Sequence, residues 1–202
     1  MSKKINFPTI LTILRMILAF VFLVLMLCGM NICNWDTRFS SAETMQPCNS
    51  EEIAFFIAAI TVFIAAAITD KIDGDYARKH NQVTELGKFL DPLADKMLVN
   101  TAFLLFVAMG VVPVWAFALI LWRDFAVDGM RMMVAAKGEV VAASIWGKAK
   151  TMTQMVTLVL LLLNLILENV TLTVIGLVLM YVVVILTVFS GVDYLVKGLK
   201  KI

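Results

Sequence analysis

Long runs of apolar residues, separated by short polar stretches, repeat along the whole chain. Most of these runs approach the length that an α-helix needs to cross a bilayer, which is about 20 residues. They lie at residues 10–30, 53–69, 97–112, 114–133, 152–167 and 172–190. The pattern predicts an all-α fold, a polytopic membrane protein with six transmembrane helices.

The composition supports a membrane protein and excludes an ordinary soluble domain. Of the 202 residues, 61% are hydrophobic, and the mean hydropathy is +0.93. No linker or low-complexity stretch interrupts the chain, so we expect residues 1–202 to form a single domain. The net charge of +2 is modest and gives no reason to expect a nucleic-acid partner.

The distribution of Lys and Arg predicts the orientation in the membrane. If the N-terminus is cytoplasmic, Arg38 is the basic residue left in an outside loop. The cytoplasmic face then receives Lys3, Lys4, Lys71, Arg78, Lys79, Lys88, Lys96, Lys137, Lys148, Lys150, Lys197, Lys200 and Lys201. This bias follows the positive-inside rule and predicts a multi-pass protein of the cell membrane with both termini in the cytoplasm. In the outside loop, a disulfide between Cys33 and Cys48 is sterically possible in an oxidising exterior.

Four aspartates, Asp70, Asp73, Asp91 and Asp95, lie where two apolar segments meet. Ionised carboxylates near lipid are costly unless a cation compensates them. On helices, the first pair (i, i+3) and the second pair (i, i+4) would each share one face. Oxygen ligands suit Mg²⁺, Mn²⁺ or Ca²⁺ rather than Zn²⁺. The spacing predicts a divalent-metal site at the cytoplasmic face, although a merely solvated polar hairpin would also contain acidic residues.

The residues between the aspartates suggest a phosphate ligand. Gly74, Ala77 and Gly87 leave room for a bulky group, and the Arg78 guanidinium suits phosphate oxygens. The complete pattern reads Asp-x2-Asp-Gly-x2-Ala-Arg-x8-Gly-x3-Asp-x3-Asp.

This pattern resembles the defining motif of the CDP-alcohol phosphotransferases, membrane enzymes that move a phosphoalcohol from a CDP-linked donor to a second alcohol. The resemblance implies two divalent cations, Mg²⁺ or Mn²⁺, held by Asp70, Asp73 and Asp91. It implies that Asp95 is the general base and also belongs to the metal-binding set. It also implies a CDP-donor pocket lined by Gly74, Ala77, Arg78 and Gly87, and a homodimer.

The first apolar segment contains an arginine, Arg15, that needs a partner within the membrane. Thr12 lies three residues earlier and would share its face of a helix. The opening Pro8-Thr9-x-Leu11-Thr12-x-x-Arg15 is similar to that of the same family, in which it lies next to the nucleotide. Two interpretations remain open for Arg15: it binds the CDP donor with Thr12, or it pairs structurally with one of the aspartates.

Four basic residues in the second half predict an anion pocket. Arg123 and Arg131 are eight residues apart, so they lie close to one face of a helix, and Lys148 and Lys150 begin the next apolar segment. A phosphorylated acceptor would need such a pocket, whereas serine or choline would not. The alternative is ordinary positive-inside lysine together with an Arg123–Asp124 or Asp128–Arg131 pair.

The spacing Arg-Asp-x6-Arg, followed by Gly-Lys-x-Lys-Thr-x-x-Gln, resembles the branch of the family that uses CDP-diacylglycerol as donor and sn-glycerol 3-phosphate as acceptor. Two rival functions remain. One is the same chemistry with serine, inositol phosphate or phosphatidylglycerol as the acceptor. The other is a divalent-cation transporter, because carboxylates within membranes also mark ion pathways.

Overall fold

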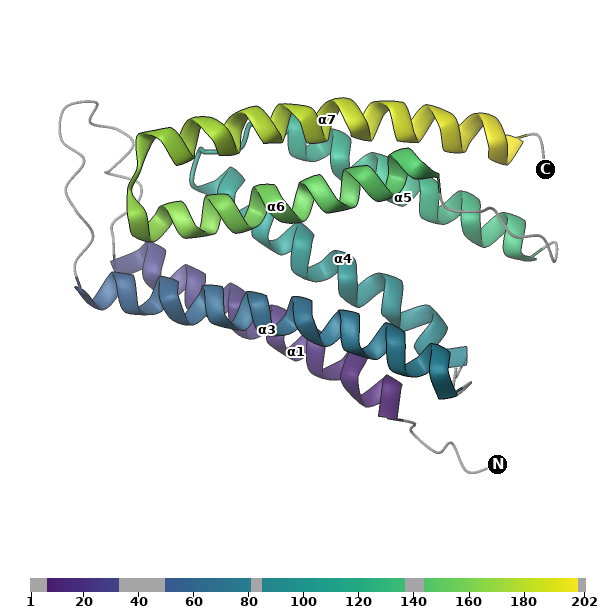
Figure 1. The fold of residues 1–202 in the computed structure, drawn as a ribbon, viewed down its shortest axis with the longest axis horizontal. Helices are drawn as coiled ribbons and strands as arrows, with labels where there is room; N and C mark the ends of the chain where they lie inside the picture. Colours follow the sequence, from purple (N-terminus) through teal and green to yellow (C-terminus); the bar gives the residue numbers. More distant parts are fainter. Residues whose placement is uncertain (1–6, 33–49, 81–84, 137–143, 200–202) are drawn as a thin grey trace. The chain divides into compact units, whose positions relative to one another are not determined.

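The computed structural model describes the backbone of residues 7–32, 50–80, 85–136 and 144–199. The side chains at 7–9, 32, 70–93, 95, 135–136 and 197–199 lie outside the described part. Over these ranges the chain is helical apart from the short connections at 109–113, 144 and 168–169, and it contains no strand, which confirms the all-α prediction (Figure 1). The helices are α1 (Phe7–Ile32), α3 (Ser50–His80), α4 (Glu85–Ala108), α5 (Val114–Ala136), α6 (Ile145–Leu167) and α7 (Val170–Leu199).

Four of these helices are long and apolar enough to cross a membrane, by length and composition. The spans are Ile10–Asn31, Ser50–Thr69, Ile145–Leu167 and Val170–Val196, and α4 contributes a shorter apolar stretch, Lys96–Ala108. Their outward faces are as apolar as their buried ones: on α1, Ile17 and Phe20 are exposed while Phe22 and Met26 are buried. Such helices suit lipid rather than water. A polytopic membrane protein is thus supported, and the count of six spans and the cytoplasmic orientation stay predictions.

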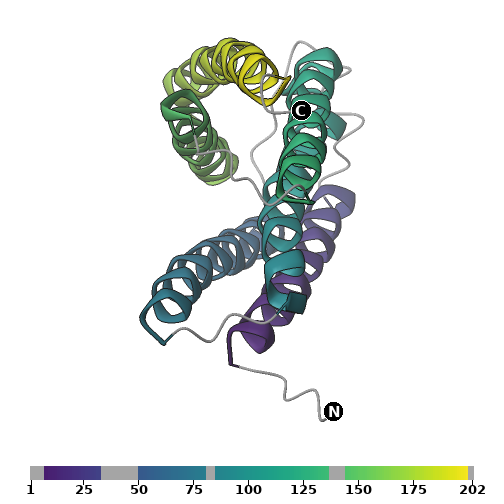
Figure 2. The same ribbon diagram turned by 90° about the vertical axis from the view of Figure 1, so that its right-hand side faces the viewer.

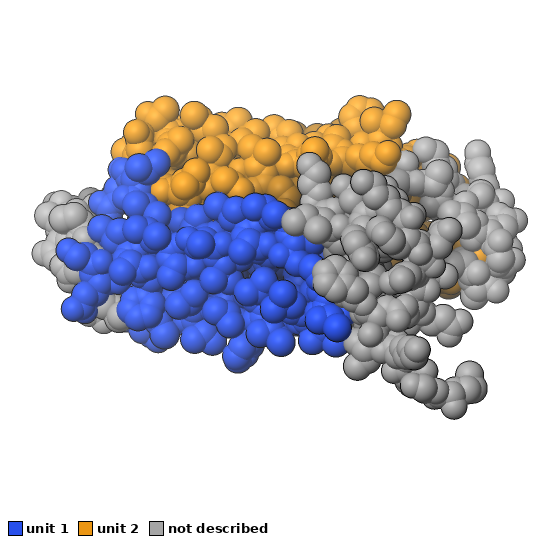
Figure 3. Space-filling view, turned by 60° about the horizontal axis from the view of Figure 1, so that its bottom comes forward, with its two compact units in different colours: residues 1–105, 165–168 blue, residues 106–164, 169–202 orange. Residues whose placement is uncertain are grey.

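The chain divides into two compact units, coloured separately in Figure 3. Unit 1 comprises residues 1–105 and 165–168, and unit 2 comprises residues 106–164 and 169–202. The expectation of one domain over residues 1–202 stays a prediction. The possible Cys33–Cys48 disulfide lies outside the described residues.

In unit 1, α1 packs against α3 through small and aromatic residues. The rings of Phe22 and Phe63 have centroids 5.5 Å apart. At Gly29, a Cβ atom would lie 2.9 Å from Cε1 of Phe56, so the glycine lets the two helices approach closely. The N-terminal end of α1, the C-terminal end of α3 and the N-terminal end of α4 lie toward the same end of this unit (Figure 1).

Unit 2 contains α5, α6 and α7. Helix α5 packs against α7, and α6 runs beside α7 in both ribbon views (Figures 1 and 2). Gly110, with φ of 74°, turns the chain between α4 and α5 in the left-handed conformation that glycine tolerates. Asn169 caps α7, because its Oδ1 accepts a hydrogen bond from Thr171 N at 2.8 Å. The ends of these helices are therefore defined by local chemistry.

Candidate functional site

The structure places the acidic motif on two consecutive helices of unit 1. Asp70, Asp73, Gly74, Ala77 and Arg78 lie near the C-terminal end of α3. Gly87, Asp91 and Asp95 lie in the N-terminal half of α4. The backbone therefore has the helical spacing on which the two same-face aspartate pairs depend. The side chains of these residues lie outside the described part, so their roles toward metal and CDP donor stay predictions.

Oxygen atoms make up the whole predicted ligand set, and this chemistry fits a hard divalent cation. Among the side chains that the structure describes, no group of three or more His, Cys, Asp or Glu residues could hold a metal ion. The side chains of the four aspartates lie outside the described part, so this absence does not concern them. The metal site therefore rests on the motif and its helical placement.

Thr12 and Arg15 lie on the buried face of α1. Their exposed fractions are 0% and 2%, and they continue into the buried stripe of Ala19, Phe22 and Met26. Burial of a guanidinium among apolar residues is costly unless polar groups compensate it. This burial is consistent with the expectation that Arg15 needs a polar partner. Whether Arg15 binds the CDP donor or pairs structurally with one of the aspartates stays open.

In unit 2, a buried carboxylate joins α5 to α6. Lys150 Nζ donates a hydrogen bond to Asp124 Oδ1 at 2.6 Å, and Arg123 Nη1 donates to the same oxygen at 3.0 Å. The side chains of Lys150, Asp124 and Arg123 are 3%, 9% and 13% exposed. The Arg123–Asp124 pair was one of the alternatives that the sequence offered. The ion pair to Lys150, 26 residues away, was not predicted.

Tyr194 of α7 organises the two arginines of α5. Its hydroxyl oxygen accepts hydrogen bonds from Arg131 Nη2 at 2.5 Å and from the backbone N–H of Ser144 at 3.1 Å. The guanidinium carbons of Arg131 and Arg123 lie 5.0 Å and 5.6 Å from the centre of its ring. These distances are within the range of cation–π attraction. Arg123 and Arg131 are thus brought together, as the spacing of eight residues predicted.

The guanidinium of Arg123 has one further hydrogen-bond donor. Arg123 Nε is buried and has no hydrogen-bond acceptor among the described residues, and the same is true of the amide nitrogen of Gln154. Buried donors are nearly always paired in folded proteins, so each of these two needs a further partner, such as a water molecule or a bound ligand. The cluster formed by Arg123, Arg131, Lys148, Lys150 and Tyr194 is called the basic cluster below.

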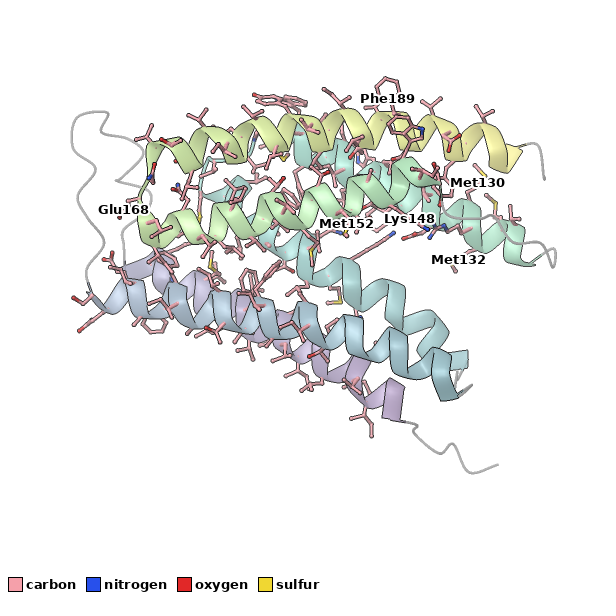
Figure 4. The ribbon with its side chains drawn as sticks, in the orientation of Figure 1. Met130, Met132, Lys148, Met152, Glu168 and Phe189 are labelled. Carbon is pink, nitrogen blue, oxygen red and sulfur yellow. The ribbon has the colours of Figure 1, made fainter. Side chains whose placement is uncertain are left out.

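The predicted acceptor residues have different environments. Arg123 and Arg131 both contact Tyr194, and Lys150 is buried against Asp124. Lys148 lies two residues before Lys150 on α6, where its side chain is exposed. Figure 4 labels Lys148 on α6 and Met130 on the neighbouring part of α5. The structure thus joins Arg123, Arg131 and Lys150 through Tyr194 and Asp124, and Lys148 is placed by its position on α6. The binding of an acceptor phosphate by these four residues stays a prediction.

Sequence reasoning missed Tyr194 and the central position of Asp124. Tyr194 follows a long apolar run in the stretch Ser190-Gly191-Val192-Asp193-Tyr194, where an aromatic residue resembles an ordinary membrane-interface residue. The useful signal was Gly191: a Cβ atom there would lie 3.1 Å from Arg123 Cγ. A glycine in the last turns of an apolar helix can mark a close approach of another side chain.

Comparison with known proteins identifies relatives over almost the whole chain. A family model described as CDP-alcohol phosphatidyltransferase matches residues 5–189. The chain is 41% identical over 194 residues to a Bacillus subtilis protein named CDP-diacylglycerol–glycerol-3-phosphate 3-phosphatidyltransferase. That match covers 96% of this chain and 95% of the relative.

Two further relatives extend the comparison. A Mycobacterium tuberculosis protein named probable phosphatidylglycerophosphate synthase is 34% identical over 201 residues, covering 100% of this chain and 85% of its own length. A Shigella flexneri protein with the same name as the Bacillus relative is 34% identical over 197 residues, covering 95% and 94%. These matches span both units and both candidate sites.

Proposed function

The chain belongs to the CDP-alcohol phosphatidyltransferase family, and on that premise we propose that it transfers the phosphatidyl group of CDP-diacylglycerol to sn-glycerol 3-phosphate. The products are phosphatidylglycerophosphate and CMP. The names of relatives that match most of the chain support this donor and this acceptor. The structural support is the basic cluster of unit 2, which provides cationic hydrogen-bond donors for the phosphate group of the acceptor.

The observation that carries the choice of acceptor is the pairing of Arg123 and Arg131 on Tyr194. Both guanidiniums contact one aromatic ring, and the Nε atom of Arg123 is buried without an acceptor among the described residues. Guanidinium groups bind phosphate through parallel N–H donors, a geometry that a neutral acceptor cannot use. Serine carries a carboxylate and phosphatidylglycerol a singly charged phosphodiester, so neither presents the phosphate dianion that suits two guanidiniums best. Inositol phosphate does present one, and the acceptor panel below separates it from sn-glycerol 3-phosphate.

The donor half of the reaction rests on the motif in α3 and α4. Members of this family generally use divalent metal ions, and two such ions, Mg²⁺ or Mn²⁺, would be held by Asp70, Asp73, Asp91 and Asp95. When bound, they would neutralise the diphosphate and the charge that develops on CMP. Gly74, Ala77, Arg78 and Gly87, with Thr12 and Arg15 on α1, are the residues that we assign to CDP-diacylglycerol.

The chemical step needs one proton acceptor from the chain. Asp95 removes the proton from the free hydroxyl of sn-glycerol 3-phosphate. The hydroxyl oxygen then bonds to the phosphorus that carries diacylglycerol, and the bond from that phosphorus to CMP breaks. The phosphate of the acceptor does not react, so the arginines that hold it serve binding and orientation.

The setting that we propose is the cytoplasmic membrane. The apolar helices indicate a multi-pass membrane protein. The uneven distribution of lysine along the sequence supports an orientation with both termini and the site in the cytoplasm. CDP-diacylglycerol, a membrane lipid, would enter from the bilayer. The family resemblance supports a homodimer.

An acceptor panel tests the proposed function. The purified full-length chain is given CDP-diacylglycerol and Mg²⁺, and CMP release is measured with sn-glycerol 3-phosphate, serine, inositol phosphate or phosphatidylglycerol. We expect sn-glycerol 3-phosphate to give the highest kcat/KM and unphosphorylated glycerol to be a poor acceptor. A higher kcat/KM with serine or phosphatidylglycerol would reject the acceptor and keep the family. Absence of CMP release with every acceptor would reject the reaction.

A further inference from the structure

Tyr194 is the point at which three helices of unit 2 meet. Its side chain is 2% exposed. From α7 it contacts Arg123 and Arg131 of α5, and its hydroxyl accepts the backbone N–H of Ser144, directly before α6. The neutral side chain of Tyr194 thus holds the guanidinium groups of Arg123 and Arg131 and the backbone just before α6.

The chemistry of this contact differs from that of an ion pair. A carboxylate that holds a basic side chain also cancels its charge, as Asp124 does for Lys150 at 2.6 Å. The tyrosine hydroxyl and ring attract a guanidinium without cancelling its charge. The single Asp124 carboxylate is shared by Lys150 and Arg123, so Arg123 keeps part of its charge, and Tyr194 holds Arg131 without cancelling the charge of that guanidinium.

Two glycines make this arrangement possible. A Cβ atom at Gly147 of α6 would lie 3.4 Å from Cε2 of Tyr194 and 3.6 Å from Nη2 of Arg123. A Cβ atom at Gly191 of α7 would lie 3.1 Å from Arg123 Cγ, closer than side chains normally approach. The stem and the guanidinium of Arg123 are therefore confined by backbone on two sides, which reduces the number of rotamers open to this long side chain.

We propose that Tyr194 is a positioning residue, which holds Arg123 and Arg131 at the separation needed to bind the phosphate group of the acceptor. In naming the acceptor this inference rests on the proposed function. Whatever the acceptor is, Tyr194 determines the affinity of the basic cluster for a phosphate dianion. It does so through the arginines and takes no part in the transfer itself.

The decisive variant is Tyr194→Phe, which keeps the ring and removes the hydrogen-bond acceptor of Arg131 and Ser144. Losing a hydrogen bond from a charged donor should raise the KM for sn-glycerol 3-phosphate about tenfold, equivalent to about 1.4 kcal/mol. The KM for CDP-diacylglycerol should stay within about twofold, because the donor residues lie on other helices. Tyr194→Leu, which also removes the ring, should raise the acceptor KM further.

Tyr181→Phe is the matched control, because it makes the same change on the same helix. Tyr181 is 52% exposed, and its ring lies 6.3 Å from that of Trp115. We expect this variant to keep wild-type KM values for both substrates. Equal loss of donor and acceptor affinity in Tyr194→Phe, or unchanged affinity for both, would overturn the inference.

A second measurement separates this inference from the proposed function. Inorganic phosphate is titrated into the purified full-length protein, and the rise in Tm gives its apparent affinity without any acceptor. We expect Tyr194→Phe to weaken phosphate binding about tenfold and Tyr181→Phe to leave it unchanged. If glycerol 3-phosphate fails as acceptor while this difference persists, the proposed function is wrong and the role of Tyr194 stands. If wild-type protein shows no stabilisation by phosphate, the inference is wrong.

Discussion

Lys150 and Asp124 form a buried ion pair, with Nζ and Oδ1 2.6 Å apart, that joins α6 to α5 in unit 2. Taken as whole residues, Lys150 is 2% exposed and Asp124 is 6% exposed, so neither charge is well solvated. The two charges compensate each other, because an isolated charge in a buried position is costly. Because Asp124 offsets the charge of Lys150 and, at 3.0 Å, part of that of Arg123, we expect Arg131 to contribute most to phosphate binding.

Removal of one member of this pair should destabilise the protein strongly. Asp124→Asn leaves the ammonium of Lys150 buried without its carboxylate, and such changes cost about 3–5 kcal/mol. The double variant Asp124→Asn with Lys150→Met should recover part of this loss, since the buried ammonium is gone and Arg123 is the cation that still lacks the Asp124 carboxylate. Thermal unfolding of the purified proteins in detergent measures the stability of the single and the double variant. A double variant that is no more stable than Asp124→Asn would contradict the ion-pair interpretation.

Arg131→Ala should weaken the acceptor selectively. A charge-assisted contact is worth about 1.5–3 kcal/mol, so the KM for sn-glycerol 3-phosphate should rise about tenfold to a hundredfold. The KM for CDP-diacylglycerol should change little. Steady-state kinetics with each substrate varied in turn gives both values. Equal changes in the two KM values would show that the acceptor pocket is misassigned.

Asp95→Asn should abolish most of the turnover. A positioned general base contributes about two to four orders of magnitude to rate, and the amide cannot accept the hydroxyl proton in its place. We expect kcat to fall by that amount in the CMP-release assay, while binding of CDP-diacylglycerol is largely kept. Near-normal turnover of the purified variant would remove Asp95 from the catalytic role.

Gly29→Ala should loosen the packing of α1 on α3. The added Cβ would lie 2.9 Å from Cε1 and 3.2 Å from Cδ1 of the fully buried Phe56 ring. Overpacking of this kind costs about 1–3 kcal/mol and should lower the Tm of the purified protein.

Gly129→Ala on α5 is the matched control, because nothing lies within 4 Å of its added Cβ. Alanine there should be neutral or stabilising by up to about 1 kcal/mol, since glycine is a poor helix former. If the two variants had equal Tm values, close packing at Gly29 would not matter for stability.

Much of the protein follows from its sequence, because the signals are local. Apolar runs of membrane-spanning length predicted the helices; the structure places helices over five of these runs in full and over residues 97–108 of the run 97–112, where turn residues follow α4. The spacing of the aspartates required helical backbone at Asp70, Asp73, Asp91 and Asp95, and they lie in α3 and α4. The motif also identified the family, which the match to residues 5–189 confirms.

Tertiary structure alone decided which partners the charged residues of the second half have. The sequence offered Lys150 as a phosphate ligand or an orientation charge, yet it is buried on Asp124, 26 residues away. It gave no reason to bring Tyr194 to Arg131, 63 residues apart. Helical periodicity determines which residues share a face, because it depends on neighbours within a few turns. The choice of facing helix depends on the packing of α5, α6 and α7, where glycines at 147 and 191 let Arg123 approach, and no local pattern encodes it.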